Sequence, residues 1–390
     1  MPNFVFLIFV VLVLFTLHGY VIFRILPILG LNNNPSILIV FITGIFSFLP
    51  ILPPILRMIG FENRAIDKFS LIGYTSFGFF SFTFMIFLFR DLFINVVNLT
   101  ENFFKVSLPV DNTKRDFLIK MSSLAILSSS TVSTAYGFYN SRKGPLVKKQ
   151  DVFLKNLPKE FENFTIAQIS DLHVGPTIKK SYVNNVLNQI SQVNPDMIAV
   201  TGDLIDGSVD HLRKDLEPFM DLSAPYGTYF VTGNHEYYSG VDQWLDETDR
   251  LGMINLINSN TKIIKANSEI FLAGITDYRA HQIKKSHRSN PALALKNISN
   301  DKIKILLAHQ PNSIYAVNEV GADLQLSGHT HGGQFWPFNY PTKFANAYLS
   351  GLHDHNGTQI YVNSGTGYWG PPLRLGVPAE ITLVCLKTKV

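Results

Sequence analysis

Seven side chains of the kinds that bind metal ions stand at five places along the chain, each where an apolar run gives way to a loop. They are Asp171 with His173, then Asp203, Asn234, His309, and finally His329 with His331. Carboxylate, amide and imidazole groups are ligands that Mn, Fe and Zn accept alike, so a shared site for such ions is the chemistry that these residues indicate.

Each of these residues alone has an ordinary structural explanation, because an Asp after a strand is usually a cap and a lone His is usually a satisfied polar group. Five of the eleven histidines nevertheless fall in these motifs, counting His235. In the Asp171-Leu172-His173 step the two polar side chains share one face of an extended backbone and can grip one ion. Glycines on both sides of His329-Thr330-His331 let the backbone approach an ion or a phosphate. Chance is a poor explanation for the whole set.

In order, the motifs read D-x-H, G-D-x-x-D, G-N-H-E, an isolated H, and G-H-T-H. Over about residues 160 to 385 they resemble the calcineurin-like metallophosphoesterase family. The tail from Ser364 to Arg374 further resembles the membrane-associated bacterial branch of that family, which is related to cell-envelope phosphoesterases. The resemblance implies a layered metallophosphoesterase-type β-sandwich flanked by helices.

The resemblance also implies two divalent or trivalent metal ions, of Mn, Fe or Zn. One would be held by Asp171, His173 and His331. The second would be held by Asn234, His309 and His329, with Asp203 bridging both. Two such cations neutralise phosphate oxygens and acidify a shared water, so that a metal-bridging hydroxide attacks phosphorus in line.

The proton for the departing oxygen would come from His235, which stands next to a ligand without being one, and Asp206 would orient and charge-stabilise it. The arginine that usually follows this Asp in the family is Gly207 here, so that phosphate clamp is missing. This argues against a phosphoprotein phosphatase of the calcineurin type proper. Arg279 and Arg374 are candidates to replace the arginine, and a surface position fits the sequence around each equally well.

The elements that must position these residues follow from the hydrophobic pattern after the first 155 residues. Runs of strand length alternate with amphipathic helical stretches, which predicts an α/β layered fold. Strands are expected at 164–170, 196–203, 226–234, 269–275, 302–309, 323–329, 358–365 and 380–386, and helices at 181–193, 211–223 and 241–251. The first strands and those around 305 and 326 end at the metal-binding motifs.

The chain before residue 140 has a different composition. Phe4 to Phe23, Pro35 to Leu56 and Ser70 to Phe89 contain no Asp, Glu, Lys or Arg and are long enough to cross a bilayer, with Met121 to Tyr139 as a marginal fourth span. Prolines at the end of the second span predict a kink or an early exit there. We therefore expect a transmembrane helical region at 1–140, a linker at 141–155 and a metallophosphoesterase domain at 156–390.

The orientation rests on one segment before the marginal span. Thr113 to Lys120, with its basic pair followed by Phe-Leu, resembles a twin-arginine export signal in which Lys replaces the first arginine. Basic residues around the other spans favour neither side. The resemblance predicts an integral membrane protein whose catalytic domain is extracytoplasmic.

Charge and cysteine usage exclude other classes. The net charge of +4 is small and scattered, so nucleic-acid binding is not expected, and the single Cys385 excludes an intrachain disulfide and a thiol-based metal site. The three clear spans have no charged residue to line an ion path, which disfavours a transporter.

Two functions remain. The first is a membrane-anchored, dinuclear metal-dependent phosphoesterase, a phosphatase or phosphodiesterase acting on phosphomonoesters or phosphodiesters of envelope lipids or nucleotides. A lipid-linked phosphate ester and the membrane are then its partners, and four aromatic residues near the motifs could form an apolar wall for the substrate or pack in the core: Phe335, Trp336, Tyr368 and Trp369. The alternative is a catalytically weak, metal-binding membrane scaffold or interaction protein.

Overall fold

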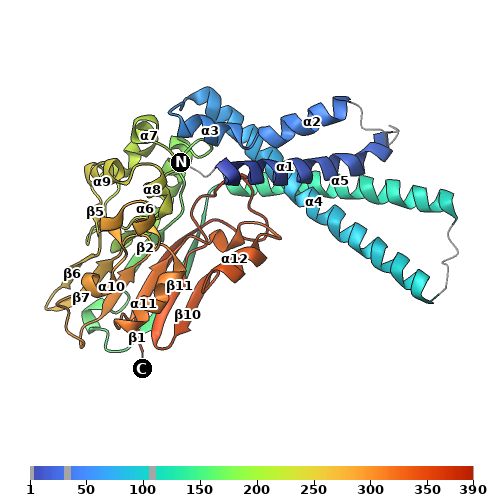
Figure 1. Ribbon diagram of the computed structural model, residues 1–390. Helices are drawn as coiled ribbons and strands as arrows, with labels where there is room; N and C mark the ends of the chain where they lie inside the picture. The colour runs from blue at the N-terminus through green and yellow to red at the C-terminus, as the bar shows by residue number, and fades with distance from the viewer. Residues whose placement is uncertain (1–3, 30–36, 105–110, 390) are drawn as a thin grey trace. The chain divides into compact units, whose positions relative to one another are not determined.

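The computed structural model describes residues 4–29, 37–104 and 111–389 of the chain. It divides into two compact units, of which the first comprises Met1–Tyr139 with Gly370–Leu373 and the second Asn140–Trp369 with Arg374–Val390. The elements of both are labelled in Figure 1. Each unit is described by itself below.

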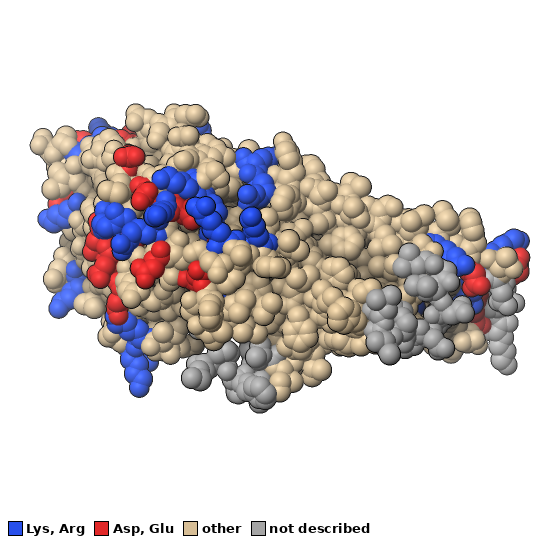
Figure 2. Space-filling view, turned by 90° about the horizontal axis from the view of Figure 1, so that it is seen from above, with Lys and Arg blue, Asp and Glu red and all other residues tan. Residues whose placement is uncertain are grey.

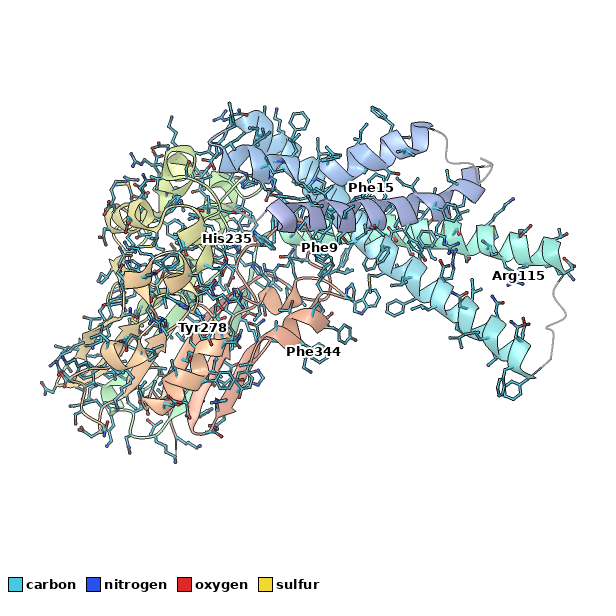
Figure 3. All side chains as sticks on the ribbon, in the orientation of Figure 1. Phe9, Phe15, Arg115, His235, Tyr278 and Phe344 are labelled. Atoms are coloured by element: carbon cyan, nitrogen blue, oxygen red, sulfur yellow. The ribbon has the colours of Figure 1, made fainter. Side chains whose placement is uncertain are left out.

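The first unit is helical. Its elements are α1 (Phe4–Ile25), η1 (Leu26–Leu29), α2 (Ile37–Phe48), α3 (Leu52–Met58), α4 (Arg64–Phe104) and most of α5 (Asn112–Arg142). Two of the described helices are long and apolar enough to cross a membrane, at Ile8–Ile25 and Arg64–Phe104. Apolar side chains on α1 point outward, as Figure 3 shows for Phe9 and Phe15, which are 62% and 41% exposed. Exposed apolar surface of this kind is expected of a helix that contacts lipid.

The predicted span from Pro35 to Leu56 is not one continuous helix in the described residues. Its first two residues lie outside them, α2 ends at Phe48 after 12 residues, and a turn separates it from α3. At about 1.5 Å per residue, α2 is about 18 Å long and falls short of a bilayer core of about 30 Å. Pro50, Pro53 and Pro54 lack the amide hydrogen that would continue the helix, and two of them lie in the first turn of α3.

The two remaining predicted spans lie inside longer helices. Ser70 to Phe89 is part of the 41-residue α4. Met121 to Tyr139 is part of the 31-residue α5, which also contains the twin-arginine-like segment and which is not among the described helices apolar enough to span. Ser and Thr side chains throughout α5 account for its lower apolarity. The face drawn in Figure 2 shows few charged side chains along the helical unit except near one end.

The second unit contains two six-stranded sheets. The first has the order β1 (Leu146–Leu154), β12 (Glu380–Thr388), β2 (Thr165–Ile169), β3 (Met197–Val200), β4 (Thr228–Phe230) and β5 (Ile254–Asn255). The second has the order β10 (Gly351–His355), β11 (Thr358–Val362), β9 (Leu324–Ser327), β8 (Lys304–Leu307), β7 (Ser268–Gly274) and β6 (Ser259–Lys265). Strands β2 to β5 are parallel, and so are β7, β8, β9 and β11.

Helices cover the outer faces of both sheets. The first sheet packs against α6 (Lys180–Val193), α7 (Val209–Leu216) and α9 (Val241–Arg250), and the second against α10 (Pro291–Ala294) and α11 (Ile314–Glu319). Between the sheets lies an apolar core to which both contribute, among others through Ile166, Ala199, Leu307 and Leu326. Four layers result, and the predicted α/β fold with its layered sheets is confirmed.

Each of the eight predicted strands has a counterpart, and the helices at 181–193 and 241–251 correspond to α6 and α9. The helix expected at 211–223 ends earlier, at Leu216, and is followed by a short 3-10 helix from Glu217 to Asp221. Pro218 in this segment lacks the amide hydrogen that would continue the α-helix. Strands β1, β5, β6 and β10 were not predicted.

The largest difference concerns the expected linker at 141–155, which contains the nine-residue strand β1. This strand pairs in parallel with β12 along its whole length. It lies at the sheet edge, where only Val152 and Leu154 are buried. Four consecutive polar residues, 148–151, interrupt its apolar pattern, so the sequence does not indicate a strand there.

Trp244 on α9 is the largest fully buried side chain in the core under the first sheet, and its indole N–H donates to the carbonyl of Gly207 at 3.0 Å. We expect Trp244→Ala to lower the free energy of unfolding by about 3–5 kcal/mol, because the change leaves a cavity and an unpaired carbonyl. Thermal unfolding in detergent measures the effect. Trp369→Ala is the matched control, since Trp369 is 53% exposed and its loss should change stability by about 0.5 kcal/mol at most. Equal unfolding midpoints for the two variants would contradict the assignment.

Candidate metal centre

The predicted ligands come from strand ends of both sheets. Asp171 and His173 follow β2, Asp203 follows β3 and Asn234 begins α8 (Asn234–Tyr238) after β4, all from the first sheet. His309 follows β8, and His329 and His331 follow β9, from the second sheet. The carboxyl ends of parallel strands lie at one edge, which is where α/β folds commonly bind ligands.

The backbone at five of these residues has a positive φ angle, which non-glycine residues seldom adopt. The angles are 53° for Asp171, 50° for His173, 50° for Asp203, 71° for His329 and 51° for His331. Such conformations cost about 1–3 kcal/mol each and persist where the surroundings fix them, most often at functional sites.

Glycines allow the two sheets to approach at this edge. A Cβ atom on Gly328 would lie 1.9 Å from Ser170 Oγ and 2.2 Å from Asp171 Oδ2. A Cβ on Gly233 would lie 2.2 Å from Asp203 Oδ1. No side chain fits at either position, so both motifs need glycine for close contact rather than for flexibility.

One group of donor atoms joins Asp171, His173 and His331. The two imidazole Nε2 atoms face one another at 3.1 Å, and His331 Nε2 lies 3.5 Å from Asp171 Oδ1. All three residues are buried, and one ligand atom from each lies within 4.8 Å of the others.

A second group joins Asp203, His309 and His329. His309 Nε2 lies 3.1 Å from Asp203 Oδ2 and 3.2 Å from His329 Nδ1. The Oδ2 atom of Asp203 is also 3.8 Å from His173 Nε2, so this carboxylate reaches both groups. Asn234 directly follows Gly233, which packs on Asp203. The Oδ1 atom of Asn234 is buried and has no hydrogen-bond partner among the described residues.

These donors fit a pair of metal ions. Two nitrogens bound to one ion at about 2.1 Å with near-tetrahedral angles lie about 3.2–3.4 Å apart, close to the separation of the paired imidazoles here. Facing lone pairs repel one another unless a proton or a cation lies between them, and the buried Asn234 oxygen likewise lacks a positive partner. The donor set of oxygen and nitrogen atoms suits Mn, Fe or Zn.

Comparison with known proteins agrees with this geometry. The model of the calcineurin-like phosphoesterase family matches residues 164–333. The "Uncharacterized metallophosphoesterase" of Helicobacter pylori (strain J99) is 39% identical over 255 residues, which are 65% of this chain and 67% of that protein. The chain belongs to the calcineurin-like metallophosphoesterase family.

Two further similarities extend this finding. The "Transmembrane protein with metallophosphoesterase domain" of Danio rerio is 32% identical over 278 residues, 69% of this chain and 63% of that protein. The solved structure of the Haemophilus influenzae NAD nucleotidase is similar to 53% of this chain and 50% of that one. The TM-score of 0.36 and the sequence identity of 18% are too low for this similarity to bear on function. Members of the family act on phosphate esters and typically bind two metal ions. The apolar helices, together with a relative named as a transmembrane protein, indicate membrane association.

Burial keeps several of the imidazoles in the form that binds metals. It lowers the pKa of His173 to about 3 and that of His329 to about 3, in each case with the further effect of a neighbouring histidine. Burial would raise the pKa of Asp203, but His309 and His235 outweigh it and hold this pKa well below its usual range. Neutral His173 and His329 and an ionised Asp203 are in the forms that bind metal ions. Burial lowers the pKa of His309, but the charge of Asp203 outweighs it and raises this pKa well above its usual value.

The predicted acid pair of the phosphoesterase lies beside these groups. His235 Nδ1 is 3.3 Å from Asp206 Oδ1, and the backbone N–H of His235 donates to Asp203 Oδ1 at 2.8 Å. Burial lowers the pKa of His235, but the charges of Asp203 and Asp206 outweigh it and raise this pKa to about 9. The residue therefore carries a proton at neutral pH.

Two aromatic rings flank His235. The ring centroids of Tyr238 and Trp369 lie 5.4 and 5.6 Å from that of His235, in edge-on arrangements. Both aromatic residues are more than half exposed, at 65% and 53%. Tyr368 and Phe335 are buried, so among the aromatic residues near the motifs these two pack in the core.

Sequence reasoning assigned no role to Glu236, although it is the last residue of G-N-H-E. Its buried carboxylate accepts the backbone N–H groups of Asp203 at 3.0 Å, Leu204 at 2.8 Å and Gly233 at 2.6 Å. It thereby fixes the loops that follow β3 and β4. The acidic side chain three residues after Gly233, at the start of a helix, was the available signal.

Arg374 is neither on the surface nor able to clamp a phosphate. It is 1% exposed, and its guanidinium donates to the carbonyls of His331 at 3.0 Å, Ser364 at 2.8 Å and Gly365 at 3.2 Å. One of its nitrogens also lies 3.3 Å from His331 Nδ1. The side chain supports the loop that holds His331.

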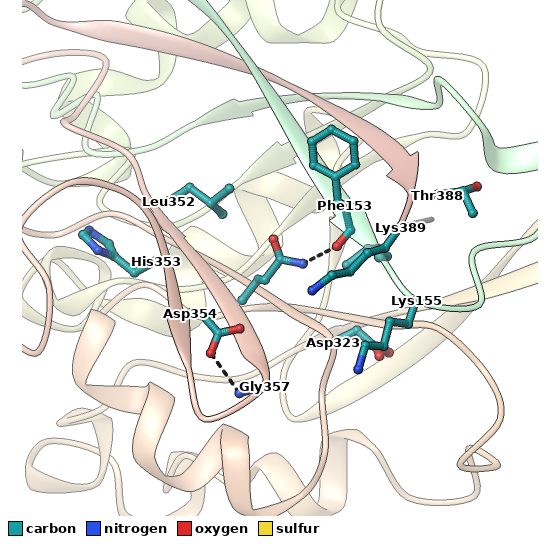
Figure 4. A pocket seen from close by; sticks show the side chains of 11 residues that line it. Phe153, Lys155, Asp323, Leu352, His353, Asp354, Gly357, Thr388 and Lys389 are labelled. Carbon is teal, nitrogen blue, oxygen red and sulfur yellow. Dashed lines mark hydrogen bonds between the residues drawn. The ribbon is translucent and has the colours of Figure 1, made fainter.

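A hollow of about 700 Å³ in the same unit does not belong to this site. It lies at the start of β9 and β11, the edge opposite the metal-binding motifs, and none of the predicted ligands lines it. Figure 4 shows its mixed lining, with Lys155 and Lys389 near Asp323 and Asp354. The Asp354 carboxylate is bound by the backbone N–H of Gly357 at 3.1 Å.

Replacing Arg374 tests its support of the His331 loop. Arg374→Met keeps most of the apolar stem and removes the guanidinium, so the carbonyls of His331, Ser364 and Gly365 lose their donor. We expect a loss of about 3 kcal/mol or more in the free energy of unfolding, and a metal content that falls from about two ions per chain toward one. Thermal unfolding and plasma mass spectrometry measure the two effects. Arg288→Met, at an exposed arginine, is the control, and unchanged metal content in Arg374→Met would refute the supporting role.

Proposed function

We propose that the protein is a membrane-anchored phosphoesterase that uses two metal ions to hydrolyse phosphomonoesters or phosphodiesters. The observation that carries this proposal is the position of Asp203, whose Oδ2 lies 3.1 Å from His309 Nε2 and 3.8 Å from His173 Nε2. One carboxylate within reach of imidazoles from both groups of donor atoms supports a bridging role between two cations.

Asp171, His173 and His331 would hold one ion and Asn234, His309 and His329 the other. Ions held there would neutralise phosphate oxygens and lower the pKa of a water so that it could attack phosphorus. The buried strand ends and the hydrogen bonds of Glu236 keep the ligand side chains in place before substrate arrives, so little reorganisation opposes the reaction.

His235 donates the proton that the leaving oxygen needs, and Asp206 holds the imidazole in position through Nδ1. Tyr238 and Trp369 present exposed rings on either side of this donor. The leaving group of the substrate therefore meets an apolar wall, which favours an alcohol with an apolar body, such as a lipid or a nucleoside.

The membrane helices favour a substrate at or near the bilayer. We assign residues 1–140 to the membrane region and 156–390 to the catalytic domain, to which the strand β1 within 141–155 also belongs. Tethering holds the catalytic domain at high effective concentration relative to lipid phosphates. The twin-arginine-like segment around Arg115 supports an extracytoplasmic catalytic domain.

The alternative of a non-catalytic scaffold is expected where metal ligands have been lost. All seven predicted ligands are present in the described part of the chain, and six of them form the two groups of donor atoms. No observation favours the scaffold over the enzyme.

Asp203→Asn is the direct test of the bridging ligand. The change keeps the size of the side chain and removes its charge, so the fold should survive. Turnover should fall by more than about 100-fold, which is the upper range of the loss when a residue that only supports a metal ligand is replaced. Hydrolysis of p-nitrophenyl phosphate and bis-p-nitrophenyl phosphate by the purified protein with Mn²⁺ measures this. Chelation of the wild type followed by return of Mn²⁺ should abolish and then restore activity. Full activity in Asp203→Asn would sink the two-metal proposal.

His235→Ala tests the proton donor. Esters with poor leaving groups should lose about 10²–10⁴-fold in kcat, whereas activated nitrophenyl esters should lose far less, since their leaving groups need no proton. Steady-state kinetics on an alkyl and a nitrophenyl phosphate separate the two cases. Asp206→Asn should show the same pattern in weaker form. Equal losses on both esters would remove His235 from this role.

A further inference from the structure

We propose that Arg279 binds the phosphate group of the substrate and replaces the cation that the family places where Gly207 stands here. The inference rests on the proposed phosphoesterase function and adds to it the residue that recognises the phosphate. Arg279 lies in the loop that follows β7, near the exposed Tyr278 labelled in Figure 3.

The loop is fixed to the strand ends that carry ligands of the second metal ion. The Asp277 carboxylate accepts from Gln310 Nε2 at 2.8 Å, and Gln310 directly follows His309. The backbone N–H of Asp277 donates to Thr232 Oγ1 at 3.3 Å, two residues before Asn234. Asp277 thus holds the start of the loop against the ends of β4 and β8.

The loop is anchored again directly after Arg279. Ala280 is buried and packs with Tyr237 and Val241, at α8 and the start of α9. The Tyr237 hydroxyl also lies 2.9 Å from His287 Nδ1 further along the segment. Between its two anchors, the backbone N–H of Arg279 donates to Asp277 Oδ1 at 2.8 Å. The arginine is therefore placed beside α8, the helix that begins with Asn234 and contains His235.

The guanidinium of Arg279 is exposed and, among the described residues, has no hydrogen bond or ion pair. Lys284 in the same segment is paired with Asp242, and Arg374 is surrounded by carbonyls. Of the two arginines that the sequence offered as a phosphate clamp, only Arg279 has donors available for a ligand. An unpaired guanidinium can bind two phosphate oxygens at once.

The test compares Arg279→Ala, Arg279→Lys and the matched control Arg288→Ala, at another exposed arginine of the same segment. We expect Arg279→Ala to lower kcat/KM for p-nitrophenyl phosphate by about 10- to 100-fold, the usual effect of losing a charge-assisted pair. A phosphodiester carries one negative charge fewer than the monoester dianion and should lose less. Arg279→Lys should recover part of the activity, and Arg288→Ala should match the wild type.

Binding of inorganic phosphate to the Mn²⁺-loaded full chain, measured by calorimetry, separates this inference from the proposed function. Weaker phosphate binding in Arg279→Ala supports the inference even if no ester is hydrolysed, in which case the proposed function fails alone. An active wild type with equal kinetics and equal phosphate binding in Arg279→Ala overturns the inference alone. Phosphate binding by neither protein, or losses in Arg288→Ala as large as in Arg279→Ala, would also overturn it.

Discussion

The structure depends on one electrostatic constraint, the crowding of buried imidazole nitrogens and a carboxylate whose atoms lie 3.1–3.2 Å apart. Such a cluster is stable only with positive charge in its centre, because the strand ends exclude the water that would otherwise solvate it. The positive φ angles at Asp171, His173, Asp203, His329 and His331 belong to residues of this same cluster. Backbone strain of this kind persists only where the surrounding structure fixes it.

The strained loops are held by polar groups rather than by apolar contacts. Glu236 binds three backbone N–H groups of the loops after β3 and β4, and Arg374 binds four carbonyls, those of His331, Ser364, Gly365 and Gly367. One carboxylate thus serves the loops of the first sheet, and one guanidinium serves the loop of the second. Rigid support of this kind is what allows the ligands to be placed before any ion or substrate binds.

Much of the catalytic unit could be predicted from the sequence, because buried strands such as β3 are apolar throughout and are followed closely by the motifs. The first sheet's edge strand β1 escaped prediction, since only its inner residues Val152 and Leu154 are buried. The role of Glu236 was signalled locally by its place three residues after Gly233, at the start of a helix. The role of Arg374 depends in part on the carbonyl of His331, which is 43 residues away, and no local pattern reveals it. Pro50 and its neighbours indicated the break between α2 and α3. They did not indicate how far this break shortens the predicted span from Pro35 to Leu56.

The position of β12 has a consequence for how the protein is made. This strand, from Glu380 to Thr388, lies between β1 and β2 and pairs with both. Ribosomes add residues at about 5–20 per second, and domains often begin to fold before synthesis ends. Here the first sheet stays incomplete until residue 388 has emerged, so the edges of β1 and β2 are left open for much of translation. Chaperones or an early hairpin elsewhere would have to protect those edges from pairing with other chains.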